Sequence, residues 1–232
     1  MNRKFFRVIG MSRSGIHAVA SWIRMSHVEM GYAYHYDNTV PMTFPNEQAK
    51  FLPPSGDKNE AFLWMVEHED INFLDMPVLN SKIYTNFEFT DVLVIRDVFN
   101  TMASRRKMNE KGWFSRRHIQ QWKQFAFEAL DQTKFLGPNK VVVFFNGWHK
   151  EPAKRELIAK DFGIIGVGAD TSKSATQSSW DAPTVPVAEM KLFDRWQNYA
   201  EDPMFWSVFD KQVYDLNTQL FGPNEEVLKY IK

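Results

Sequence analysis

The chain has 232 residues, of which 44% are hydrophobic and 24% charged, so it can bury the core of one large domain. Its 28 basic and 28 acidic side chains give a formal net charge of zero, which indicates neither a nucleic-acid-binding nor a membrane-surface protein. The absence of cysteine excludes disulfides, thiolate metal sites and thiol catalysis. No stretch approaches the roughly 18 apolar residues that span a bilayer, and no signal peptide is evident. We therefore expect a cytoplasmic protein with a single domain over residues 1–232.

Short apolar runs alternate with helical patterns along most of the chain. A long segment rich in proline, residues 37–59, predicts an irregular binding loop, and residues 166–187 predict a second loop. Strands are predicted over residues 5–9, 61–70, 91–97 and 140–145. Helices are predicted from residue 16 to about residue 30, from about residue 100, and over residues 118–136, 151–161, 187–200 and 207–221.

The alternation of strands and helices predicts an α/β fold with three layers, in which helices flank a central, mainly parallel sheet. The run "DVLVIRD" at residues 91–97 is continuously apolar in its middle, as is typical of a strand buried on both faces. Ligands of such sheets bind at the edge formed by the carboxyl ends of the strands. The candidate functional residues are therefore those that follow the predicted strands.

The segment "GMSRSGIH", residues 10–17, follows the first predicted strand and opens the first predicted helix. A glycine-rich turn in this place presents backbone N–H groups to an anion, and Arg13 and Ser14 add a cation and a hydroxyl. A loop for nucleoside triphosphates also needs a lysine and a hydroxyl residue after the second glycine. Ile16 and His17 stand there instead. The loop therefore predicts an anion site that does not depend on magnesium.

A second motif follows the strand at residues 91–97. The segment "VLVIRDVFNTMASRR" places Arg96 directly after the strand and Ser104 eight residues later, on the following helix. Together with the Arg13-Ser14-Gly15 turn, and in this order, the motif resembles the sulfotransferases that use 3'-phosphoadenosine 5'-phosphosulfate (PAPS). The resemblance implies a P-loop-like fold. It also implies that Arg13, Ser14 and Gly15 hold the 5'-phosphosulfate, and that Arg96 and Ser104 hold the 3'-phosphate.

The rest of the donor loop departs from the family pattern. Members usually carry hydroxyl residues where Ile16 and His17 stand, so there the backbone N–H groups would hold the donor, with Ser12 completing the loop. The late Arg-Lys-Gly stretch that also grips the 3'-phosphate has no clean match. We assign its role to Lys173 in the loop at residues 166–187. The resemblance implies PAPS as donor, adenosine 3',5'-bisphosphate (PAP) as product, and no metal.

Sulfuryl transfer requires a base that removes the proton of the acceptor. The strand end "MVEHED" offers Glu67, His68 and Glu69, and adjacent residues of a strand point to opposite sides. His68 is the favoured base because histidine titrates near neutral pH and because it lies where the family often has a catalytic histidine. Glu67 and Glu69 are its competitors, and His17 is a further candidate. Arg13 is expected to stabilise the charge that develops on the leaving phosphate.

The acceptor is expected to be a small molecule or a saccharide, and neither its identity nor the oligomeric state follows from the sequence. Two other functions are compatible with the same motifs: a kinase-like phosphotransferase, which would need ATP and magnesium, and a nucleotide-binding protein without catalysis. A cluster of basic residues after the second motif is a candidate binding surface that would attract an anionic acceptor. Its members are Arg105, Arg106, Lys107, Lys111, Arg116 and Arg117.

Overall fold

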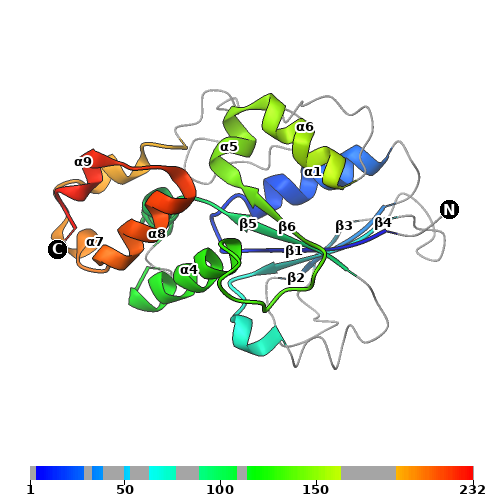
Figure 1. The fold of residues 1–232 in the computed structure, drawn as a ribbon, viewed down its shortest axis with the longest axis horizontal. Helices are drawn as coiled ribbons and strands as arrows, with labels where there is room; N and C mark the ends of the chain where they lie inside the picture. Colours follow the sequence, from blue (N-terminus) through cyan, green and yellow to red (C-terminus); the bar gives the residue numbers. More distant parts are fainter. Residues whose placement is uncertain are drawn as a thin grey trace.

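The centre of the computed structural model is a six-stranded sheet with the strand order β3-β2-β4-β1-β5-β6 (Figure 1). Each neighbouring pair is parallel except β3, which pairs antiparallel with β2. The α/β class with a mainly parallel sheet is thereby confirmed. The structure describes residues 4–28, 33–38, 50–52, 63–76, 89–108, 114–162 and 192–231. The strands are β1 Lys4–Gly10, β2 Ala33–Asn38, β3 Lys50–Leu52, β4 Leu63–Glu69, β5 Thr90–Ile95 and β6 Lys140–Phe144.

Helices connect the strands and build the C-terminal part of the chain, beyond the carboxyl end of the sheet (Figure 1). Among the described residues, no helix has both the length and the apolar character that crossing a bilayer requires. The α-helices are α1 Ile16–Val28, α3 Val98–Lys107, α4 Arg116–Ala129, α5 Phe145–Lys150, α6 Pro152–Asp161, α7 Pro203–Trp206, α8 Lys211–Phe221 and α9 Glu225–Leu228. The described residues also form the 3-10 helices η1 Phe73–Asp75 and η4 Arg195–Tyr199.

Two hydrophobic cores lie on opposite faces of the sheet. Successive side chains of a strand point to opposite faces, and β5 divides accordingly: Val92 and Val94 join one core, Leu93 and Ile95 the other. The first core is closed by α1, α5 and α6, and the second by α3, α4 and the C-terminal helices. The continuous apolar run of β5 is explained by this burial on both faces.

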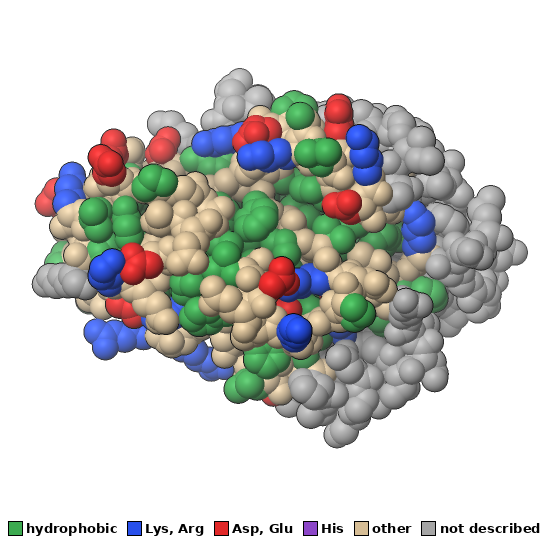
Figure 2. Space-filling view, in the orientation of Figure 1, with side chains coloured by type: hydrophobic (Ala, Val, Ile, Leu, Met, Phe, Trp, Pro, Cys, Tyr) green, Lys and Arg blue, Asp and Glu red, His purple; other side chains and the backbone are tan. Residues whose placement is uncertain are grey.

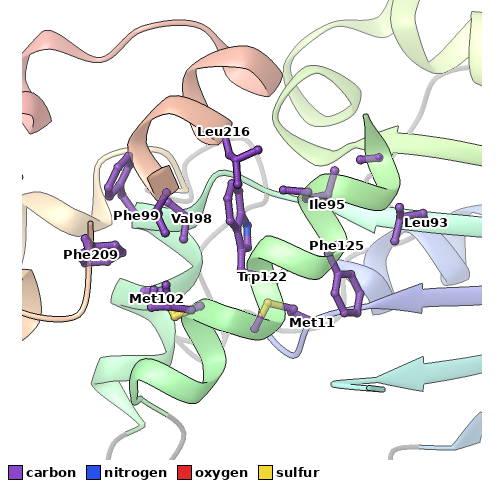
Figure 3. Packing of buried hydrophobic residues seen from close by; sticks show 14 of the residues in the cluster. Met11, Leu93, Ile95, Val98, Phe99, Met102, Trp122, Phe125, Phe209 and Leu216 are labelled. Atoms are coloured by element: carbon purple, nitrogen blue, oxygen red, sulfur yellow. The ribbon is translucent and has the colours of Figure 1, made fainter. Parts of the chain in front are cut away.

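Trp122 of α4 lies at the centre of the second core. Figure 3 shows its indole among Met102 of α3, Ile95 of β5 and Leu216 of α8. The indole nitrogen donates a hydrogen bond of 2.9 Å to the backbone carbonyl of Arg96. This one side chain therefore ties α4 and the core to the end of β5, from which the second motif begins.

Two predicted helices have different ends from those expected. The helix expected near Asn100 begins two residues earlier, at Val98, because the Asp97 carboxylate caps it by accepting a 2.9 Å hydrogen bond from the Asn100 amide. The helix expected over residues 118–136 ends at Ala129, shortly before Asp131, whose φ of 58° does not continue a helix.

Other predicted segments differ from the structure in the elements that they contain. The segment 37–59 contains β3, and β2 also enters it, so it is not irregular throughout. Of the helix expected over 187–200, the described residues hold only the short η4. The helix expected over 207–221 is present as α8, which begins at Lys211 because the Asp210 carboxylate caps it, and the short α7 before it was not predicted. Helix α5 was not predicted. The loop expected at 166–187 lies outside the described residues.

A buried ion pair joins the first strand to the fifth. Arg7 donates to both carboxylate oxygens of Asp91, at 2.7 and 2.9 Å, and their side chains are only 4% and 2% exposed. Gly137 donates its backbone N–H to the same carboxylate, at 2.8 Å. Each partner is costly to bury alone, so the pair holds the register of β1 and β5 at the end far from the site.

We predict that Asp91→Asn lowers the free energy of unfolding by roughly 3–5 kcal/mol, because it leaves the Arg7 charge buried without its counter-ion. The matched control is Asp215→Asn, which removes the exposed pair with Lys211 on α8 and should cost less than about 0.5 kcal/mol. Urea unfolding of both variants measures the difference. Equal losses would contradict the assignment.

Candidate functional site

The loops that follow β1, β4 and β5 converge at the carboxyl edge of the sheet. The register places Gly10 at the end of β1 opposite Glu69 of β4 on one side and Val94 of β5 on the other. The order of the strands reverses around β1, so the loop after it opens at the switch point where such sheets bind ligands. The two sequence motifs therefore lie beside each other in space.

The loop after β1 has a conformation that depends on glycine. Gly15 has a φ of 93°, and a Cβ atom added to it would lie 2.2 Å from the ring of Phe145. Arg13 has a φ of 75°, which is uncommon for a residue with a side chain. The Ser14 amide closes the turn by donating to the Met11 carbonyl at 3.0 Å. Helix α1 then starts directly after Gly15, as expected.

Ser14 contributes a buried hydroxyl to this loop. The residue is 2% exposed, and its Oγ has no hydrogen-bond partner among the described residues. A buried polar group without a partner is costly, and functional sites are where such groups gather. The hydroxyl is therefore suited to an anionic ligand in the loop.

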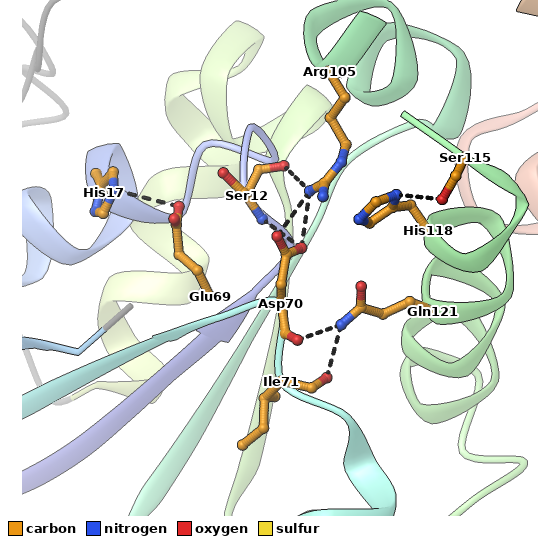
Figure 4. Close-up of polar contacts among 9 residues, drawn as sticks. All are labelled: Ser12, His17, Glu69, Asp70, Ile71, Arg105, Ser115, His118 and Gln121. Atoms are coloured by element: carbon orange, nitrogen blue, oxygen red, sulfur yellow. Dashed lines mark hydrogen bonds and ion pairs between the residues drawn. The ribbon is translucent and has the colours of Figure 1, made fainter. Parts of the chain in front are cut away.

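Arg105 of α3 holds the loop after β1 in place through hydrogen bonds. Figure 4 shows Arg105 between the loop and the end of β4. Its Nη1 donates to the Ser12 carbonyl at 3.1 Å and to both carboxylate oxygens of Asp70 at 2.9 and 3.0 Å. Asp70 in turn accepts the Ser12 amide at 3.1 Å. Arg105 is 1% exposed, so it supports the loop and does not belong to an exposed basic cluster.

Arg96 connects the second motif to the first. Its Nη1 donates to the backbone carbonyl of Arg13 at 3.2 Å, and its Nη2 donates to the carbonyl of Leu192. Its guanidinium lies over the ring of Phe145, 5.5 Å from the centroid. The side chain is buried, with 3% exposure of the residue.

Ser104 lies on α3, which packs against η4. Its Oγ accepts a 2.6 Å hydrogen bond from Nη1 of Arg195, and the Arg195 amide donates to Oδ1 of Asn100 at 2.7 Å. Ser104 is 1% and Arg195 3% exposed. Sequence reasoning missed Arg195 because the segment around it reads as an ordinary C-terminal helix. Lys173, which we expected to act beside Ser104, lies outside the described residues.

His17 is held between two carboxylates. Its Nδ1 forms a 2.7 Å hydrogen bond with Oε2 of Glu67, and its Nε2 lies 3.3 Å from Oε1 of Glu69. The His17 side chain is 39% exposed and that of Glu69 is 14% exposed, whereas Glu67 is buried. The ring is therefore reachable from outside and oriented from within, which is the arrangement of an acid–base group.

His68 lies on the other face of β4. Alternation along the strand separates it from Glu67 and Glu69 and places it with Val66, which belongs to the second core. It is 1% exposed, and burial lowers its pKa to about 3, with the charge of Arg7 adding to the effect and Glu67 opposing it. The structure thus separates the favoured base from its three alternatives.

The basic residues after the second motif do not form one cluster. Arg106 pairs with Asp202 at 3.1 Å and lies over the Phe114 ring, and Arg116 donates to the Ser207 carbonyl at 3.3 Å. With Arg105 buried, only part of the expected cluster faces outward, and Lys111 lies outside the described residues.

Burial affects the protonation of two ionisable groups at this edge. Burial lowers the pKa of the Arg13 guanidinium, with Glu69 opposing and Arg105 adding to this effect. Burial also lowers the pKa of His149 on α5 to about 4, and the nearby charges of Arg155 and Arg96 contribute.

Within the described part of the chain, no three His, Asp or Glu side chains are grouped as a metal site.

No protein-family model matches this chain, and no curated protein matches it significantly. The function must therefore be argued from the loop, the two arginines and the groups around His17.

We predict that the stability of the protein falls as the pH is lowered from about 6.5 toward 3. His68 stays neutral in the folded state, where its pKa is about 3, but takes up a proton in the unfolded chain below about 6.5. Each such group costs roughly 1.4 kcal/mol per pH unit within that window. His118 and His149, with pKa values of about 4, act in the same direction.

Urea unfolding between pH 4.5 and 7.5 tests this. Compared with the wild-type protein, His68→Gln should show a pH dependence that is smaller by about one proton. An unchanged slope in that variant would contradict the buried, neutral state of His68.

Proposed function

We propose that the protein is a sulfotransferase that moves a sulfuryl group from PAPS to a hydroxyl or amine of an acceptor. The observation that carries the proposal is the hydrogen bond from Arg96 to the carbonyl of Arg13, which joins residues 83 positions apart. Through it, the two motifs that resemble the donor-binding motifs of this family form one site. On this proposal the fold is the P-loop-like variant of the α/β class.

The residues of the loop fit the 5' end of the donor. The backbone from Ser12 to His17 runs from the strand into the N-terminus of α1, where the N–H groups and the helix dipole favour an anion. The buried Ser14 hydroxyl lacks a partner among the described residues and can donate to a phosphate or sulfate oxygen. Gly15 and Ile16 act through the backbone alone.

The residues proposed to hold the 3'-phosphate of the donor lie around the Ser104 hydroxyl. Arg195 donates to Ser104, so a 3'-phosphate at this place would meet two cations, Arg96 and Arg195. Both Ser104 and Arg96 are buried beneath the segment from Leu192 to η4. We therefore infer that this segment moves when the 3'-phosphate binds, and that Arg195 performs the role that we assigned to Lys173.

The reaction needs in-line transfer of the sulfuryl group. A bond forms between sulfur and the acceptor atom, and the bond between sulfur and the 5'-phosphate oxygen breaks, which leaves PAP. Arg13 and the loop N–H groups stabilise the charge that grows on this phosphate. The acceptor's proton passes to a base, for which the geometry favours His17, oriented by Glu67, over the buried His68. Glu69 is the second group within reach of the same place.

The kinase-like alternative is disfavoured by Ile16 and His17, because neither side chain can supply the lysine or the hydroxyl that a magnesium–triphosphate complex requires. The alternative of binding without catalysis is kept by the same two positions, because the hydroxyl residues that the family usually carries after the loop glycine are absent. The two alternatives and the proposal differ in ligand and in turnover.

Titration with PAP, and separately with ATP and magnesium, tests the donor site. We expect PAP to bind and to stabilise the protein, and Arg96→Ala to weaken PAP roughly 10–100-fold, the loss typical of hydrogen bonds to a charged group. Arg13→Gly should weaken it similarly without loss of stability, because glycine suits the φ of 75°. The control is Arg117→Ala, which changes an exposed arginine on α4.

Calorimetry gives the affinities and thermal unfolding the stabilities. Binding of ATP with magnesium but not of PAP would overturn the proposal in favour of the kinase-like alternative.

Turnover tests the base. We expect His17→Ala to lower kcat by about 10²–10⁴-fold, the usual contribution of an acid–base group, while PAP still binds. Release of PAP from PAPS is the readout, with a panel of alcohols and saccharides as acceptors. If His68→Gln loses turnover and His17→Ala keeps it, the base is His68. Absence of turnover with retained PAP binding in the wild-type protein would favour the protein without catalysis.

A further inference from the structure

A pocket of about 430 Å³ opens between the end of β5 and the C-terminal helices. Its walls come from the start of α3, from α5, from the segment 193–197, and from the end of α8 with the residues up to Glu226. None of the described residues that line it belongs to the loop after β1 or to β4. The pocket is therefore separate from the place that we propose for the sulfuryl group.

Negative charge predominates in this pocket. Four carboxylate side chains line it, and Lys150 is the one basic side chain that accompanies them in the described part of the chain. The Nζ atom of Lys150 lies 3.9 Å from the centre of the Phe193 ring. Figure 2 shows acidic side chains on the surface over α9, at the upper left of the view. Such a lining repels the phosphates of a nucleotide and attracts a cation. The four carboxylates belong to Asp97, Asp194, Glu225 and Glu226.

The Asp97 carboxylate is the buried member of this group. The residue is 6% exposed, and no ion pair joins it to a basic side chain of the described residues. Its Oδ1 accepts the backbone and side-chain N–H groups of Asn100, at 2.9 Å each, and its Oδ2 accepts Nδ2 of Asn146 at 3.0 Å. Oδ1 is thus used to cap α3, but Oδ2 can accept a further hydrogen bond. Because a buried charge is costly without a counter-ion, Asp97 suits the ammonium group of a ligand.

Asn217 of α8 adds a hydrogen-bond donor beside this carboxylate. Its Oδ1 accepts the amide of Val98, the residue after Asp97, at 2.9 Å, which fixes the orientation of the side-chain amide. Asn217 is 4% exposed, and its Nδ2 forms no hydrogen bond with the described residues, yet this nitrogen is not fully enclosed. Because Asn217 lines the pocket, its Nδ2 faces the space inside. It requires an oxygen acceptor, such as a hydroxyl of a ligand.

Aromatic side chains form the apolar part of the lining. Phe193 and Phe221 are partly exposed, and Trp196 is 4% exposed. A pocket of about 430 Å³ lies in the range of small-molecule sites and has room for a single ring with its substituents. Apolar surface with a few placed polar groups is the usual composition of such sites.

We propose that this pocket binds a hydroxylated amine with the dimensions of one sugar ring. Its ammonium group donates to Oδ2 of Asp97, and a neighbouring hydroxyl accepts from Nδ2 of Asn217. The carbon face of its ring packs on the aromatic part of the lining, and the outer carboxylates attract its charge. The proposal is independent of the function at the donor loop.

Calorimetry with glucosamine, at a pH where its amine is protonated, tests the site. We expect a dissociation constant of roughly 0.1–10 mM for a ligand of this size. Glucose carries a hydroxyl in place of the ammonium group, and cyclohexylamine carries the ammonium group on a ring without hydroxyls. Each should bind at least about tenfold more weakly, because each loses one of the two buried contacts. Absence of glucosamine binding to the wild-type chain overturns the proposal, and so does equal binding of either comparison compound.

Two variants assign the binding to this pocket, with the fold of each checked by circular dichroism. Asp97→Asn keeps an oxygen that caps α3 but removes the charge, and it should weaken glucosamine binding at least about tenfold. Asp194→Lys reverses an exposed charge at the pocket and should also weaken binding. The matched control is Glu156→Lys, which makes the same change on the exposed surface of α6 and should leave the affinity unchanged.

Equal losses of affinity in the two lysine variants contradict the assignment, as does full affinity in Asp97→Asn. If Asp97→Asn does not fold, the comparison of Asp194→Lys with Glu156→Lys decides.

Discussion

Two buried arginines after β5 hold the loop after β1 by its backbone carbonyls. Arg96 donates to the carbonyl of Arg13, and Arg105 donates to that of Ser12 and to Asp70. The N–H groups of Ser12 and Ser14 are used within this framework, by Asp70 and by the Met11 carbonyl, so the N–H groups at the start of α1 are the ones placed to face a ligand. In the loop held in this way, Arg13 and Gly15 have positive φ angles of 75° and 93°. The conformation of the candidate site therefore depends on these two arginine side chains.

The strand β4 separates two chemical environments. Glu67 and Glu69 point to the face of α1, where they meet His17, and His68 points to the opposite face, where the second core keeps it neutral. A shift of β4 by one residue would exchange these environments, since the side-chain period of a strand is two. The pairing of β1 with β4 on one side and with β5 on the other prevents that shift. The acid–base properties of the site thus depend on the register of the central strand.

The C-terminal segment closes the other side of the same edge. Leu192 and Arg195 contact Arg96 and Ser104, and Trp122 and Leu216 pack behind them. These residues come from distant parts of the chain but share one wall of the site. The segment also belongs to both cores, through Leu192 and Trp196, so exposure of Ser104 would require these two side chains to leave their packing.

The α/β class, most of the strands and the placement of two motifs at one edge of the sheet could be predicted from the sequence. This was possible because burial on both faces produces continuous apolar runs, and because glycine and proline mark the turns. The sequence could not distinguish His68 from His17, since alternation along a strand leaves open which face meets the helix. It also could not find Arg195 beside Ser104, because that contact joins residues 91 positions apart. Such contacts were decided by the tertiary structure alone, in which packing and sheet register, and not local propensity, select the partners of each side chain.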